Sequence, residues 1–96
     1  MIKSILIANR GEIACRIIAT AKKLRIKSSV IYSSEDENSL AVQMADHAFF
    51  LKSHNGEKKE YLDIDQIISI ALKNKIEAIH PGYGFLSENA NFAKLV

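Results

Sequence analysis

Four consecutive apolar residues near the start of the chain, Ile5-Leu6-Ile7-Ala8, most constrain the fold. Apolar and polar residues do not alternate here, so both faces of the strand that the run predicts must be covered. A helical pattern follows at once, because apolar residues recur on one face of the next segment. These apolar residues are Ile13, Ile17, Ile18, Ala21 and Leu24. A strand covered on both faces and followed by an amphipathic helix is typical of a parallel sheet.

The rest of the chain continues this alternation of strands and helices. Further strands are expected at residues 29–32, 48–51 and 77–79. Further helices are expected at residues 40–45, with Leu40 and Met44 facing inward, at residues 64–72, and after Ser87. The order β-α-β-α-β-α-β-α predicts an α/β domain with an open, mostly parallel sheet and helices on both of its faces. The 96 residues are enough for one small domain.

Capping residues are expected at the ends of two helices. Asn9 is expected to cap the first helix, and Glu12 stands three residues later, as in a capping box. Asp63 and Gln66 have the same spacing ahead of the helix at residues 64–72. Asn74 is expected to end that helix in a left-handed conformation.

Charge and composition exclude several classes of function. A net charge of +2, without a basic stripe interleaved with aromatic residues, argues against nucleic-acid binding. The single cysteine, Cys15, excludes an internal disulfide, and the three histidines lack metal-ligand spacing. No apolar run approaches a membrane span, and the early first strand leaves no room for a targeting peptide. We therefore expect no metal and no membrane, and a cytoplasmic protein, or a mitochondrial matrix protein if a presequence was removed.

Three loops leave the carboxyl ends of predicted strands, where open α/β sheets bind ligands. They comprise residues 9–12, 33–36 and 80–85. The first loop lacks the Gly-x-Gly-x-x-Gly pattern of a dinucleotide site, because Gly11 stands alone behind the bulky Arg10. Arg10 either pairs with a carboxylate or phosphate of a ligand or fastens two loops together.

The last loop places a tyrosine between two glycines. Gly82 and Gly84 can adopt a positive φ or admit another backbone closely, and their amides can face a ligand oxygen. Tyr83 would then present its hydroxyl outward. The alternative is a tight turn whose tyrosine packs on the end of the sheet. His80 is expected to be a hydrogen-bonded structural histidine, because neither a nucleophile nor a metal-ligand set accompanies it.

Three segments together resemble the N-terminal domain of biotin carboxylase, the module that begins the biotin-dependent acyl-CoA carboxylases and pyruvate carboxylase. They are residues 7–14 (IANRGEIA), 44–46 (MAD) and 78–89 (AIHPGYGFLSEN). Cys15 and residues 20–24 look most like the α subunits of propionyl- or methylcrotonyl-CoA carboxylase. The resemblance implies a Rossmann-like, pre-ATP-grasp domain over residues 1–96 that ends before the ATP-grasp domain.

The resemblance implies part of a ligase that uses MgATP and bicarbonate to carboxylate biotin on a carrier domain. It places Tyr83 and Gly84 on the biotin side of the active-site cleft, and Arg10, His80 and Gly82 are candidates for the rim of that cleft. The family's catalytic and ATP-binding residues lie in other domains. No catalytic residue, and no tightly bound biotin, ATP or Mg²⁺, is therefore expected in these 96 residues. The implied partners are the ATP-grasp and C-terminal domains, the biotin carboxyl carrier domain, a carboxyltransferase and a second copy of the chain.

The chain departs from the family pattern in two places. Residues 52–60 are longer and more polar than the family's Gly-Pro-rich connection, which predicts a change of surface. In the first helix, Arg16 matches the charges through which bacterial members dimerise, but Ala19 and Lys23 do not. These departures put a homodimer of the bacterial type in doubt.

Two other functions remain open on the sequence. One is a separately encoded interaction module that completes a carboxylase complex, which co-purification with an ATP-grasp polypeptide would reveal. The other is a free-standing nucleotide-binding domain, which a thermal-shift titration with NAD or ATP would reveal. The missing glycine fingerprint around Gly11 argues against the second.

Overall fold

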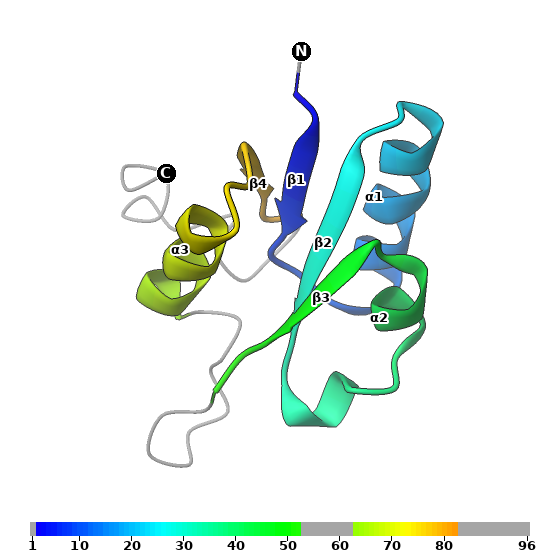
Figure 1. Ribbon diagram of the computed structural model, residues 1–96. Helices are drawn as coiled ribbons and strands as arrows, with labels where there is room; N and C mark the ends of the chain where they lie inside the picture. Colours follow the sequence, from blue (N-terminus) through cyan, green and yellow to red (C-terminus); the bar gives the residue numbers. More distant parts are fainter. Residues whose placement is uncertain (1, 53–62, 83–96) are drawn as a thin grey trace.

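A computed structural model describes residues 2–52 and 63–82. Within these ranges the chain forms a four-stranded parallel sheet with the strand order β3-β2-β1-β4 (Figure 1). The strands are β1 (Ser4–Ile7), β2 (Lys27–Tyr32), β3 (His47–Phe50) and β4 (Ala78–His80). The helices are α1 (Gly11–Lys23), α2 (Leu40–Met44), α3 (Ile64–Lys73) and a short 3₁₀ helix, η1 (Ser34–Asp36). The predicted α/β class is confirmed, and the helix expected after Ser87 lies outside the described residues.

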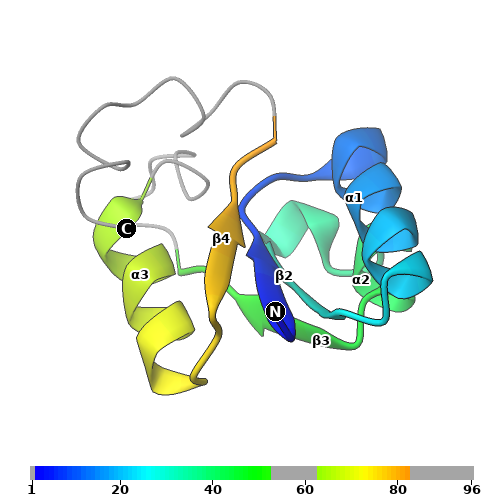
Figure 2. The same ribbon diagram turned by 90° about the horizontal axis from the view of Figure 1, so that it is seen from above.

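Successive residues of β1 enter two separate hydrophobic cores, one on each face of the sheet. The core against α3 contains Leu6, Ala8, Ile31, Leu51, Ile67 and Ala71. The core against α1 and α2 contains Ile7, Ala14, Ile18, Val30 and Ala41. Figures 1 and 2 show α3 on one side of the sheet and α1 with α2 on the other. The expectation of a strand covered on both faces is therefore confirmed, which explains the unbroken apolar run.

The expected capping box at the first helix is wrong. The N-cap of α1 is Arg10, and no side chain caps it by a hydrogen bond. Glu12 is therefore one position too early to complete a capping box with that N-cap. The Asn9 side chain instead contacts the loop after β4, as described below. The helix starts one residue later because Asn9 belongs to a tertiary contact.

The start of α3 agrees with the prediction, but its end does not. The Asp63 carboxylate caps the helix by accepting a hydrogen bond from the Gln66 backbone N–H at 3.1 Å. At the C-terminus, Asn74 has φ −103°, and the left-handed residue is Lys75, with φ +55°. The N–H of Ile76 bonds to the Ala71 carbonyl at 2.9 Å, as in a Schellman motif. The α1 helix ends in the same way, with Arg25 at φ +59°.

Some apolar residues on the predicted helical faces are exposed. Leu40, expected to face inward, is 62% exposed, because Ala41 is the residue of α2 that enters the core. Leu72 of α3 is 76% exposed and Leu24, just beyond α1, is 60% exposed. Met44 is partly buried against the core, as expected. Helical periodicity therefore overestimates the width of the buried face on each helix.

Gln66 joins the residues on either side of the segment 53–62. Its side-chain oxygen accepts a hydrogen bond from the Lys52 N–H at 2.7 Å, and its side-chain nitrogen donates to the Lys52 carbonyl at 3.0 Å. The same nitrogen donates to Asp63 at 3.0 Å. The end of β3 and the start of α3 are thus fixed relative to each other. Most of the long polar loop expected at residues 52–60 lies outside the described residues.

The two-faced core predicts unequal costs for two leucine truncations. Leu6→Ala removes a fully buried side chain and should lower the free energy of unfolding by about 2–5 kcal/mol. Leu72→Ala removes a side chain that is 76% exposed and should change it by less than about 0.5 kcal/mol. Urea unfolding followed by circular dichroism measures both. Equal costs would contradict the assignment of Leu6 to the core.

Candidate functional site

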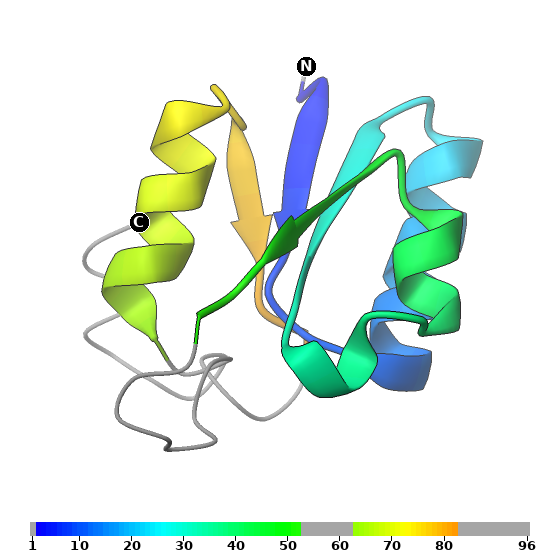
Figure 3. The same cartoon turned by 60° about the horizontal axis from the view of Figure 1, so that its bottom comes forward.

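The carboxyl ends of the four strands lie at one end of the sheet, which Figure 3 brings forward. The chain steps outward from β1 to β2 to β3 and then returns to β4 on the other side of β1. Open parallel sheets bind ligands beyond such a switch in strand order. We call residues 8–10, 33–36 and 80–82, which lie at the carboxyl ends of β1, β2 and β4, the strand-end rim. The expectation that these loops share one end of the sheet is confirmed by the contacts described next.

Asn9 joins the loop after β1 to the loop after β4. Its side chain is among the largest that are fully buried, with 2% of the residue exposed. Its Nδ2 donates to the Pro81 carbonyl at 2.7 Å, and its Oδ1 accepts from the Arg10 N–H at 2.8 Å. The last backbone contact of the two strands, from the Ala8 N–H to the His80 carbonyl at 2.9 Å, lies just before it. Asn9 therefore extends the β1–β4 pairing one residue beyond the sheet.

Gly82 fits closely against Asn9. Its φ is +68°, which disfavours any other residue. A Cβ at this position would lie 2.7 Å from Nδ2 of Asn9 and 2.9 Å from Cγ2 of Ile13, so a side chain here would force these neighbours to shift. The Gly82 N–H donates to Nδ1 of His80 at 3.0 Å. The hydrogen bond expected for His80 is thus observed, with Nδ1 of the ring as the acceptor.

Arg10 joins the loop after β1 to the loop after β2. Its Nε and Nη2 donate to the two carboxylate oxygens of Asp36 at 2.7 and 2.5 Å. The Asp36 side chain is only 11% exposed and that of Arg10 is 47% exposed. A two-point pair of this kind fixes orientation as well as distance. Of the two roles left open by the sequence, the structure shows the fastening of two loops.

The structure therefore brings three of the predicted site residues to the strand-end rim: Arg10, His80 and Gly82. Tyr83 and Gly84 lie outside the described residues. Sequence reasoning missed the contact of Asn9 with Pro81, because it used Asn9 as a helix cap. The available signal was the position of Asn9 at the carboxyl end of a strand buried on both faces.

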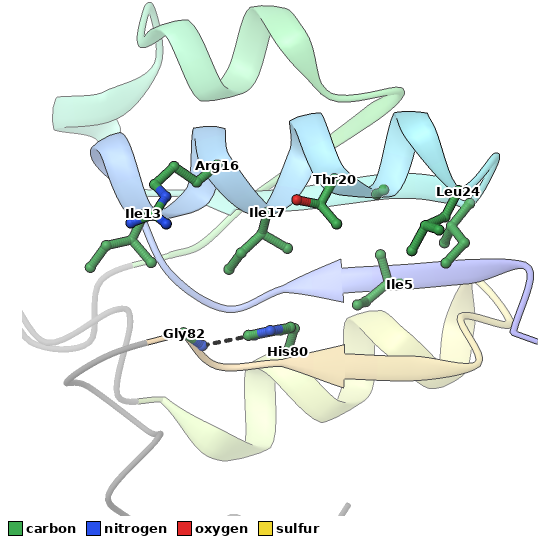
Figure 4. A pocket seen from close by; sticks show the side chains of 10 residues that line it. Ile5, Ile13, Arg16, Ile17, Thr20, Leu24, His80 and Gly82 are labelled. Atoms are coloured by element: carbon green, nitrogen blue, oxygen red, sulfur yellow. Dashed lines mark hydrogen bonds between the residues drawn. The ribbon is translucent and has the colours of Figure 1, made fainter.

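A groove of about 480 Å³ runs between α1 and the sheet beside β1 and β4 (Figure 4). Most of its lining is apolar, and Arg16, Thr20 and His80 are its polar residues. The apolar residues of the lining are Ile5, Ile13, Ile17, Ala21, Leu24 and Ile26. We call this feature the α1 groove. Several apolar residues predicted for the core face of α1 therefore also line a surface groove, and of these Ile17 packs against the core as well.

Residues 2–52 and 63–82 contain no group of three or more histidine, cysteine, aspartate or glutamate side chains that could hold a metal ion. In the same ranges, every helix is too short or too polar to cross a bilayer. Cys15 is a free thiol, partly buried against the core under α1, where the sequence had predicted packing.

Two glycines with similar backbone angles allow the contact at Asn9 to be tested. Gly11→Ala puts a side chain on a residue with φ +64° and open space around it, at a cost of about 1–2 kcal/mol in unfolding free energy. Gly82→Ala adds the overlap with Asn9 and Ile13 and should cost about 1–3 kcal/mol more. Urea unfolding of both variants gives the difference. Equal losses would show that Gly82 has room for a methyl group.

Comparison with known proteins identifies the family of this domain. The family model described as biotin carboxylase, N-terminal domain, matches residues 1–96. Biotin carboxylase 1 of Bacillus subtilis is 52% identical over 95 residues, which are 99% of this chain and 21% of that protein. The mitochondrial methylcrotonoyl-CoA carboxylase subunit alpha of Mus musculus is 51% identical over 94 residues, which are 98% of this chain and 13% of that protein.

Solved structures give the same result. The biotin carboxylase domain dimer of Hydrogenobacter thermophilus 2-oxoglutarate carboxylase, in complex with MgADP, ADP and bicarbonate, matches with a TM-score of 0.92 and 45% identity. The match covers 99% of this chain and 20% of that one. The chain thus spans about a fifth or less of the length of these relatives. It belongs to the biotin carboxylase N-terminal domain family.

Proposed function

We propose that residues 1–96 form the domain that precedes the ATP-grasp domain of a biotin carboxylase and make one wall of its active-site cleft. The observation that carries this proposal is the family match over the whole chain. The convergence of three loops at the strand-end rim supports it, because ligands of open α/β sheets bind at that place.

The complete enzyme would use MgATP to activate bicarbonate and transfer the carboxyl group to biotin on a carrier domain. ATP and Mg²⁺ would be held by the ATP-grasp domain, since the first loop of this chain lacks a phosphate-binding glycine pattern around Gly11. The solved 2-oxoglutarate carboxylase domain, which is in complex with MgADP and bicarbonate, is a relative that binds these groups. This chain would shape the cleft, and it would hold no catalytic residue of its own.

Within the cleft we assign Tyr83 and Gly84 to the biotin side. The residues before them enter this loop from β4, and Gly82 is held by its N–H bond to His80. Arg10 would support the rim through its pair with Asp36, which leaves the Arg10 side chain 47% exposed at the edge. A rim fixed in this way would present the tyrosine hydroxyl and the backbone to biotin without reorganisation.

The proposed partners are the ATP-grasp and C-terminal domains, the biotin carboxyl carrier domain and a carboxyltransferase. The α1 groove supports the first of these, because its lining is mainly apolar and Leu24 is 60% exposed. A second copy is a further proposed partner, since the 2-oxoglutarate carboxylase domain is a dimer. The proposed compartment is the cytoplasm or, as for the mouse relative, the mitochondrion.

The proposal predicts that activity requires the missing domains. The 96-residue chain alone should show no biotin-stimulated ATP hydrolysis, because the groups that bind ATP are elsewhere. The chain joined to the ATP-grasp and C-terminal domains should release ADP with bicarbonate and free biotin. A coupled assay of ADP release measures both proteins, with the ATP-grasp and C-terminal domains alone as control. Biotin-stimulated hydrolysis by the 96 residues alone would refute the proposal.

The assignment of Tyr83 predicts a loss confined to the complete enzyme. Tyr83→Phe removes one hydroxyl and should lower kcat/KM for biotin about fivefold to tenfold, the equivalent of about 1 kcal/mol for one hydrogen bond. Tyr32→Phe is a matched control, because Tyr32 packs on Phe50 with ring centroids 5.6 Å apart and keeps that contact. Circular dichroism of the 96-residue chain should be unchanged. If Tyr83→Phe instead unfolds the chain, the tyrosine has a structural role.

A further inference from the structure

We propose that Asn9 is a positioning residue for the biotin side of the cleft, acting through the Pro81–Gly82 segment. This inference rests on the proposed function, which assigns Tyr83 and Gly84 to biotin. Asn9 is 2% exposed and would touch neither biotin nor ATP. Its part would be to set the direction in which the chain enters position 83.

The Asn9 side chain bonds two backbone groups at once. Asn9 donates to the Pro81 carbonyl at 2.7 Å and accepts from the Arg10 N–H at 2.8 Å. A neutral amide offers a donor and an acceptor together, whereas an ionised carboxylate only accepts and an aliphatic side chain does neither. An amide can therefore join these two backbone groups, whereas an ionised carboxylate or an aliphatic side chain cannot.

Pro81 lies just beyond the end of the β1–β4 pairing. The β1–β4 pairing ends with Ile7 opposite His80, and the Ala8 N–H bonds to the His80 carbonyl at 2.9 Å. Pro81 has no N–H, so its carbonyl is the only backbone group through which it can continue the pairing. Asn9 bonds to this carbonyl. In residues 80–82, which are the part of this loop that the structure describes, the Asn9 side chain thus continues the connection to β1 beyond His80.

Gly82, one peptide bond before Tyr83, packs against Asn9. A Cβ on Gly82 would lie 2.7 Å from Nδ2 and 3.3 Å from Cβ of Asn9, so the two residues are in close contact. The Gly82 N–H is held by His80 at 3.0 Å. The contact with Asn9 and the hydrogen bond to His80 therefore hold the backbone that leads into position 83.

The two residues adjacent to Asn9 in the chain are themselves held in place. The next residue, Arg10, makes a two-point pair with Asp36 at 2.7 and 2.5 Å. The preceding residue, Ala8, is fully buried in the core against α3. The backbone of Asn9 is held on both sides, so a displacement of the Pro81–Gly82 segment cannot be absorbed by moving Asn9 itself. The amide thus connects the rigid end of β1 to the biotin-side loop.

The test uses the complete enzyme, with residues 1–96 joined to the ATP-grasp and C-terminal domains. Asn9→Asp keeps the volume of the side chain but loses the donor to Pro81, and Asn9→Ala removes both contacts. Either variant should lower kcat/KM for free biotin about tenfold or more through misplacement of the loop. Bicarbonate-dependent ATP hydrolysis without biotin should stay within about twofold, since Asn9 would not act on ATP.

Asp46→Ala is the matched control. Asp46 also bonds a buried backbone N–H, that of Ser28 at 2.9 Å, but at the opposite end of the sheet, where β2 and β3 begin. Asp46→Ala should lower the melting temperature, as the Asn9 variants also should, and it should leave the biotin kinetics unchanged. If Asn9 had a purely structural role, Asn9→Asp would behave like Asp46→Ala. It would then change biotin-dependent hydrolysis no more than biotin-independent hydrolysis.

The outcomes separate the inference from the proposed function. An active parent enzyme whose Asn9→Asp variant keeps the parent's kcat/KM for biotin overturns the inference alone. Equal losses with and without biotin also overturn it. A parent enzyme without biotin-stimulated hydrolysis overturns the proposed function and the inference together. If Asn9→Ala fails to fold, Asn9→Asp decides, because it preserves the packing against Gly82.

Discussion

The burial of β1 on both faces is the constraint on which the rest of the structure depends. Leu6, Ile7 and Ala8 are completely buried, and they alternate between the core under α3 and the core under α1 and α2. The same strand pairs with β2 on one edge and β4 on the other. A strand held on four sides has little freedom, so the residues that leave it begin from a fixed point. The strand-end rim starts at that point.

Local patterns in the sequence predicted the elements because each strand and helix is defined by its own periodicity. The side-chain contacts at the strand-end rim instead join residues that are far apart in the sequence. Asn9 contacts Pro81 across 72 positions of sequence, and Arg10 contacts Asp36 across 26. No local pattern records such contacts. Asn9 also fitted the local rule for a helix cap, so the tertiary contact replaced the predicted one. The sequence placed these loops at one end of the sheet without indicating which side chains join them.

The helices show a second limit of periodicity. An apolar residue on a helix can face the core or a surface groove, and its spacing is the same in both cases. In α1, Ile18 is fully buried while Ile17 lines the α1 groove. The helix ends show a related limit, because the left-handed residues are Arg25 and Lys75 where propensity favours glycine or asparagine. At both helix ends, the position of the left-handed residue depends on how the chain returns to the sheet.

The contacts at the strand-end rim suit the proposed division of labour. If ATP and bicarbonate are handled by other domains, this domain would contribute through the accuracy with which it positions biotin. A loop carried only by its own backbone would lose that accuracy beyond His80, where the strand pairing ends. The Asn9 amide and the fit of Gly82 extend the order of the sheet towards position 83. Orientation of this kind lowers a barrier without any reacting group, because the entropy of alignment is lost during folding and not during the reaction.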